Sequence, residues 1–118
     1  MKSSDLLRIQ HIASYCEDIS KTIERFGESE EAFWDDVGYR NSISMSIMQI
    51  GELSAGLTDD FKTATQAQMP WGLIRGMRNM FAHTYSKMDR TIIWEVATRD
   101  IPTLLLFCQK VIEENEPI

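Results

Sequence analysis

Arg78 and His83 are the two side chains whose types and spacing best suit chemistry on a phosphate group. The guanidinium of an arginine stays charged, and its planar fork matches phosphate oxygens in both the ground state and the transition state. An imidazole accepts or donates a proton near neutral pH, which contributes about 10²–10⁴ in rate. Cleaving a phosphodiester by attack of a 2′-hydroxyl needs both abilities. Either residue alone is more often structural, so the pair carries the hypothesis.

Three neighbouring side chains extend this candidate site. Asn79 follows the arginine directly and can orient His83 or contact a substrate. Tyr85 lies two residues after the histidine and is expected at or beyond the end of a helix, where its hydroxyl is exposed. Arg75 precedes Arg78 by one turn and is a candidate phosphate ligand, although a surface ion pair explains it equally well.

A helix from Pro70 to about His83 is predicted to hold these residues, because proline suits the first position of a helix. At about 100° per residue the segment has three faces. The predicted core face carries Leu73, Ile74, Met77, Met80 and Phe81. The second face carries Gly72, Gly76, Asn79 and His83. The third carries Trp71, Arg75, Arg78, Ala82 and Tyr85. Trp71 and Trp94 are expected in the core or in a dimer interface.

The glycine face is a candidate contact surface. A glycine inside a helix costs about 1 kcal/mol relative to alanine, and close approach of another backbone is the usual compensation. That backbone can belong to the same bundle or to a second copy of the chain. Arg78 and His83 lie roughly 140° apart on a straight helix. They would diverge within one protomer but could converge across a two-fold dimer, so we expect a homodimer with a composite cleft.

The remaining elements are also predicted to be helical. Apolar residues recur every three or four positions, and no segment alternates as a strand would. We expect a first helix from Ser3 or Ser4 to Gly27, a short segment after Ser29 that breaks or bends at Gly38, a long helix from Tyr39 to near Gly56, a further turn from Thr58 or Asp59 through Phe61, a short segment capped by Asp89, and a last helix that starts at Asp100 and Pro102. The predicted fold is an all-α antiparallel helical bundle of about five helices with short additional turns, in one domain spanning residues 1–118.

The charge distribution limits the kind of nucleic-acid partner. The net charge of −6 argues against tight, non-specific binding of long nucleic acids, because that binding scales with the phosphates neutralised. Residues 69–90 are the exception, with Arg75, Arg78, Lys87 and Arg90 against Asp89 alone. A local positive site can therefore accept an RNA strand.

Several other classes of site are not expected. Cys16 and Cys108 fall on apolar helical faces and are predicted to be buried small hydrophobes. With two histidines and no Glu-x-x-His or His-x-x-x-His pair, we expect no metal and no cofactor. The longest apolar run, Leu104 to Cys108, is far shorter than the ~18 residues of a membrane span. No signal-peptide pattern opens the sequence, so a cytoplasmic location is expected.

Residues 78–85 read Arg78-Asn79-Met80-Phe81-Ala82-His83-Thr84-Tyr85. This stretch resembles the Arg-x-x-x-x-His-x-Tyr signature of HepT-like toxins in the HEPN superfamily. The resemblance extends to flanking blocks in the same order and covers nearly the whole chain. These blocks are Gln49-Ile50-Gly51-Glu52, Pro70-Trp71, Gly76-Met77-Arg78-Asn79, and the closing pattern of Asp89, Trp94, Asp100-Ile101-Pro102 and Leu105.

The resemblance implies a dimeric helical bundle that cleaves RNA without a metal, as the toxin of a toxin–antitoxin pair. It also implies an antitoxin partner, a minimal nucleotidyltransferase that adenylylates the motif tyrosine. Carried over to this sequence, Arg78 and His83 are the catalytic pair, Asn79 is the supporting residue and Tyr85 is the modification target. An AMP group on Tyr85 would place an anion beside Arg78 and block the cleft.

A second interpretation uses the same residues. The chain could be a non-catalytic subunit of a nucleotidyltransferase complex, with the Arg78–His83 cleft holding a nucleotide or the partner. The sequence does not separate the two interpretations, but replacing His83 with alanine does, because only an enzyme would lose RNA cleavage.

Overall fold

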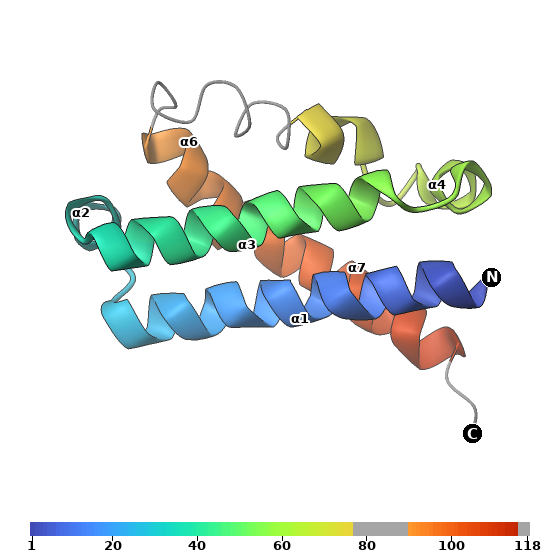
Figure 1. The fold of residues 1–118 in the computed structure, drawn as a ribbon, viewed down its shortest axis with the longest axis horizontal. Helices are drawn as coiled ribbons and strands as arrows, with labels where there is room; N and C mark the ends of the chain where they lie inside the picture. Colours follow the sequence, from blue (N-terminus) through green and yellow to red (C-terminus); the bar gives the residue numbers. More distant parts are fainter. Residues whose placement is uncertain (77–89, 116–118) are drawn as a thin grey trace.

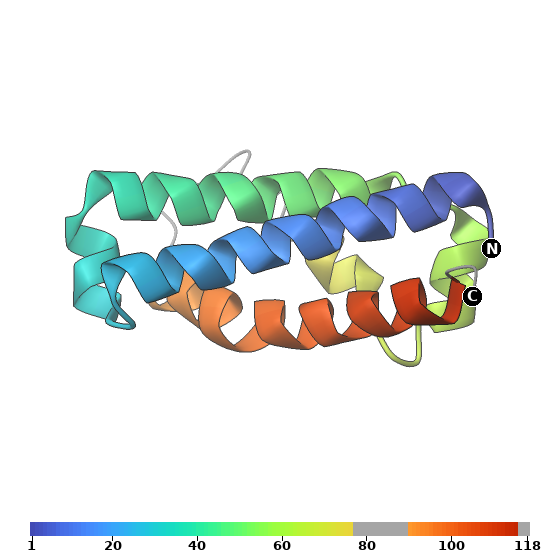
Figure 2. The ribbon, with the colours of Figure 1, turned by 90° about the horizontal axis from the view of Figure 1, so that it is seen from below.

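The computed structural model describes residues 1–76 and 90–115, and these residues form helices and connecting turns only. The long helices α1 (Ser3–Phe26) and α3 (Val37–Ala55) run antiparallel, and α7 (Ile101–Asn115) packs beneath α1, as Figures 1 and 2 show. This arrangement confirms the predicted all-α bundle. No helix of the described ranges combines the length and apolar character needed to cross a membrane.

The predicted end of the first helix is confirmed. Gly27 caps α1 with a φ of 105°, a backbone conformation that residues with a side chain rarely adopt. The Gly27 carbonyl accepts a hydrogen bond of 2.9 Å from the hydroxyl of Tyr39, which is fully buried. The turn between α1 and α3 is thereby attached to the core.

The prediction of a break at Gly38 is wrong, because the chain turns at Asp36. Helix α2 (Glu30–Asp35) is capped by Ser29, whose hydroxyl accepts from the Ala32 amide. Asp36 is extended, and its Oδ1 accepts from the Tyr39 amide at 3.1 Å, so it caps α3. A capping aspartate starts the new helix, and Gly38 lies in its first turn.

Three further predicted boundaries hold with small changes. Gly56 caps α3, and Thr58 caps α4 (Asp59–Thr65), which is longer than the single turn expected. The next helix begins at Trp71, and the Pro70 carbonyl accepts from the amides of Leu73 and Ile74. Pro70 is thus the residue before the helix. Its missing N–H is tolerated there because an N–H at the start of a helix has no intrahelical acceptor.

Helix α7 begins at Ile101, between the predicted start residues Asp100 and Pro102, but the chain does not leave the helical conformation before it. Residues 90–115 are continuously helical: α6 (Arg90–Glu95), a π-helical turn (Val96–Asp100) and α7 follow one another. In the wide turn the amide of Ile101 bonds to the carbonyl of Val96, five residues back. Proline in a regular helix collides with the carbonyl four residues earlier. The widened turn accommodates Pro102 without ending the helix.

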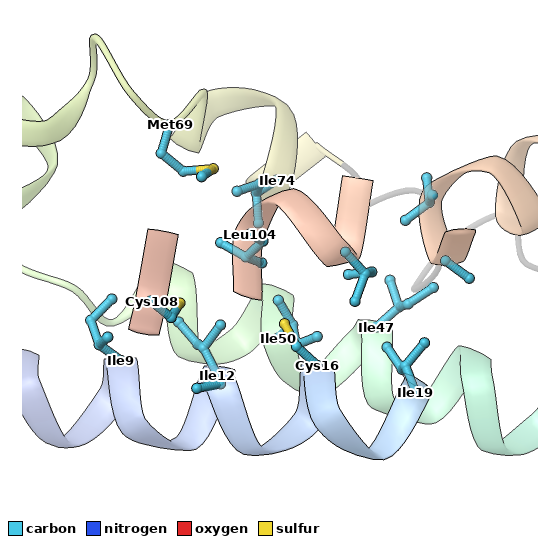
Figure 3. Close-up of a cluster of buried hydrophobic side chains, with 14 of the residues drawn as sticks. Ile9, Ile12, Cys16, Ile19, Ile47, Ile50, Met69, Ile74, Leu104 and Cys108 are labelled. Carbon is cyan, nitrogen blue, oxygen red and sulfur yellow. The ribbon is translucent and has the colours of Figure 1, made fainter. Parts of the chain in front are cut away.

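The core runs the length of the bundle. Its middle is built from the predicted stripes of α1, α3 and α7, drawn in Figure 3, and includes Ile9, Ile12, Cys16, Ile19, Ile47, Ile50, Leu104 and Cys108. One end holds an aromatic cluster, in which Phe33 contacts Tyr39 and Trp94 at ring-centroid distances of 5.4 Å each. Trp94 is a core aromatic, one of the two expectations for it.

Candidate functional site

The structure describes the beginning of the predicted site helix, residues 71–76. Arg78, Asn79, His83 and Tyr85 lie outside the described residues, as do Met77, Met80, Phe81 and the predicted cap Asp89. The mutual geometry of Arg78 and His83 therefore stays a prediction. What the structure places is the turn that leads into this segment and the surface around it.

Trp71 anchors this turn to the bundle. The indole N–H donates to the Thr65 hydroxyl at 2.9 Å, and only 7% of Trp71 is exposed. Its ring packs against Phe61 and Phe107, with centroid distances of 6.1 and 5.7 Å. The site helix therefore leaves the core from a point fixed by α4 and α7.

Helix α4 is tied in turn to the start of α1. Asp5, only 1% exposed, accepts two hydrogen bonds from Thr58, one from its amide at 2.9 Å and one from its hydroxyl at 2.6 Å. The same hydroxyl caps α4 by accepting from the Phe61 amide at 3.2 Å. Polar contacts at both ends of α4 thus join α1 to the site helix.

The core face predicted for this helix needs correction. Ile74 is buried near Met69 and Leu104, as Figure 3 shows, but Leu73 is 75% exposed. The large indole of Trp71 points inward, and the side of the helix that carries Trp71 and Ile74 faces the bundle. Leu73, about 100° from Ile74, therefore turns outward. Its exposed side chain borders an apolar hollow of about 220 Å³ between the site helix and the start of α7.

The two glycines of the helix face open space. A Cβ atom built on Gly72 or Gly76 would meet no described atom within 4 Å. Tight packing inside the same bundle, one of the two explanations offered for these glycines, is therefore not found among the described residues. Contact with a second copy remains a prediction.

Arg75 points to the surface on this turn. It makes no salt bridge with any described residue, so an ion pair does not account for it there. It borders a small hollow together with Lys62 of α4. The sequence reasoning missed Lys62, which lies in an acidic half of the chain on a helix expected to be a single turn. The one feature of the sequence that could have indicated Lys62 is the short connection between α4 and the site helix.

The two cysteines are buried on facing helices, as predicted. Both side chains are fully inaccessible, and burial raises the pKa of the Cys108 thiol to about 12 and that of Cys16 further. Protonated, enclosed thiols are poor nucleophiles. They belong to the core and not to the site.

Comparison with known proteins adds family information. The model of the family described as Ribonuclease HepT-like matches residues 12–111. A protein of Caldanaerobacter subterraneus subsp. tengcongensis, described as a putative RNase, is 28% identical over 92% of this chain and 94% of its own length. A protein of Thermococcus cleftensis, named as a probable ribonuclease HepT, is 30% identical over 76% of this chain and 86% of its own. No solved structure shows significant similarity to the chain.

Proposed function

Because this chain belongs to the HepT-like ribonuclease family, we propose that it is an endoribonuclease that cleaves RNA without a metal ion, as the toxin of a toxin–antitoxin pair. The observation that carries the proposal is the extent of the family match. Residues 12–111 include the whole stretch from Arg78 to Tyr85 and its flanking blocks.

In the proposed reaction, His83 takes the proton of a ribose 2′-hydroxyl as its oxygen attacks the adjacent phosphorus. The bond to the 5′-oxygen breaks, and that oxygen receives a proton as it leaves. Arg78 binds the phosphate oxygens and stabilises the charge that builds on them. Asn79 supports the pair by orienting His83 or by contacting the RNA. The products carry a 2′,3′-cyclic phosphate and a 5′-hydroxyl.

A homodimer completes the proposed site. Two described features support it: the open space beside Gly76, and the exposed side chain of Leu73 on the same turn. A second copy that packs here would cover apolar surface and bring its own Arg78 and His83 to one cleft.

The proposed antitoxin is a minimal nucleotidyltransferase that transfers AMP from ATP to the Tyr85 hydroxyl. The new anion would pair with Arg78 and occupy the space of the substrate phosphate. The partner with ATP is therefore expected to add AMP to the chain but not to a Tyr85→Phe variant, as intact-mass measurement would register.

The decisive experiment incubates purified chain with total RNA in the presence of a chelator and compares it with a His83→Ala variant. Cleavage by the parent chain and its loss in the variant, by at least about 10²-fold, are expected. His11 is the matched control, because it is the other histidine of the chain and is exposed on α1. A His11→Ala variant should cleave normally. Cleavage by His83→Ala at the parent rate would reject the assignment and favour a non-catalytic subunit.

A further inference from the structure

The hollow beside the site helix is lined by residues of three elements. They are Ser54 and Ala55 at the end of α3, Lys62 of α4, and Trp71, Gly72 and Arg75 of the site helix. Its volume is about 130 Å³, below the roughly 300 Å³ at which pockets for larger organic ligands begin. It has room for a compact anion and not for a nucleoside.

Two cations, Lys62 and Arg75, line this hollow, and the described part of the chain supplies no salt-bridge partner for either. This holds although Asp59 lies one turn before Lys62 in α4. Two like charges beside one hollow repel each other weakly in water, and an anion bound between them would offset that repulsion. An arginine fork and a lysine point charge together suit a phosphate.

The residues that line the hollow favour a phosphodiester group of a nucleic-acid strand over a free phosphate ion. Gly72 carries no side chain and has open space above it, so a backbone can approach closely there. A second hollow of about 360 Å³ adjoins the first and shares Lys62, Trp71 and Gly72 with it. Its other lining residues are Asp59, Thr63, Gln66, Met69 and Pro70, so it offers hydroxyl and amide groups as well as one carboxylate. A phosphate held by the cations would thus have space beside it for its attached nucleoside.

This site is close to the proposed scissile phosphate in any conformation of the chain. Only Gly76 and Met77 lie between Arg75 and Arg78, so their Cα atoms are three steps apart, and a fully extended chain spans at most about 11 Å over that length. The Cα separation alone corresponds to about three nucleotides of a stacked strand, and the reach of the two arginine side chains adds to it.

Relying on the proposed function, we propose that Lys62 and Arg75 form an RNA-binding subsite that holds a phosphodiester group a few nucleotides from the one that is cut. The polar contacts at both ends of α4 keep this subsite in shape. Thr58 fixes one end to Asp5, and Thr65 fixes the other to Trp71, so the two cations are held on elements joined by hydrogen bonds.

The test measures binding of a 2′-O-methyl oligoribonucleotide, which lacks the attacking hydroxyl, as a function of salt concentration. Each phosphate contact on a single strand contributes about 0.7 to the slope of log affinity against log salt. Lys62→Ala and Arg75→Ala should each lower the slope by about this amount and weaken low-salt binding about fivefold. Lys62→Arg should restore both. Lys110→Ala is the control, because it removes the same charge from an exposed position on α7.

A slope for Lys62→Ala equal to that of Lys110→Ala would overturn the subsite. Loss of ATP binding in Lys62→Ala, with oligonucleotide binding unchanged, would also overturn it by assigning the hollow to a free nucleotide. This test of the subsite is independent of the test of the proposed function, because it measures binding of an RNA that cannot be cleaved. If His83→Ala still cut RNA, the nuclease assignment would fail while the slopes still decided the subsite.

Discussion

Thr58 is the residue on which the placement of α4 depends. Its hydroxyl donates to the buried carboxylate of Asp5 and accepts from the Phe61 amide, and its own amide donates to the same carboxylate. Asp5 is 53 positions away in the sequence, so this contact closes a long loop of chain. A carboxylate buried to this degree needs such partners to offset its desolvation.

We therefore expect Asp5→Ala to lower the free energy of unfolding by about 2–3 kcal/mol. The substitution leaves the part-buried amide and hydroxyl of Thr58 without their acceptor, and unsatisfied buried donors cost about 1–3 kcal/mol. Urea unfolding followed by circular dichroism measures the change. Asp60→Ala, an exposed aspartate in the first turn of α4, is the control and should change stability by less than about 0.5 kcal/mol. Equal effects of the two substitutions would show that the buried contact contributes nothing of its own.

At the scale of the element, caps were predicted better than breaks. Ser29, Thr58 and the Gly27 and Gly56 ends could be identified from residue type, because a cap depends on one or two local hydrogen bonds. Gly38 misled the prediction because it was interpreted as a break, whereas Pro102 was expected at the start of a separate helix and lies in a continuous one. Asp36 started its helix two residues before the glycine, and a widened turn kept the helix continuous through the proline. Both outcomes depend on neighbours whose effect no single residue type indicates.

The apolar spacing of the site helix also failed to predict which of its sides faces the core. Apolar spacing favoured Leu73 as a core residue, but tertiary contacts of the Trp71 ring with Phe61 and Phe107 decide the rotation. Lys62 was missed for a similar reason, since its proximity to Arg75 arises from the packing of α4 against the site helix. Arg75 itself, three residues from the motif, was recognised from the sequence.

Gly76 provides a test of the helix surface. A Cβ atom at this position would meet no described atom within 4 Å, and alanine has a higher helix propensity, so Gly76→Ala should stabilise the isolated chain by up to about 1 kcal/mol. If a second copy packs closely against the glycine, the same methyl group should weaken the dimer, which concentration-dependent light scattering would register. Gly38→Ala is the control, because α3 begins at the far end of the bundle (Figure 1). An unchanged dimer would contradict close approach at this face.

For the whole molecule, the central question is whether one active site draws on two copies. Mixed dimers answer it, because Arg78→Ala and His83→Ala are each expected to be inactive alone. If a site combines Arg78 of one copy with His83 of the other, a mixed dimer contains one intact site. Equal mixing should then restore about a quarter of the parent RNA-cleaving activity, since about half the dimers are mixed and each has one of its two sites intact. No recovery after subunit exchange, verified by native mass spectrometry, would place both residues in the same protomer.

The π-helical turn at Val96–Asp100 determines how α6 is rotated about the helix axis relative to α7. It holds an additional residue between α6 and α7, so deleting Thr98 would rotate α6 by about 100° about its axis. Trp94 would then turn away from Phe33, and the buried Ile93 would turn out of the core, while the helix content barely changed. The number of residues in this turn, more than their identity, therefore fixes the angle at which the chain enters the bundle at Arg90.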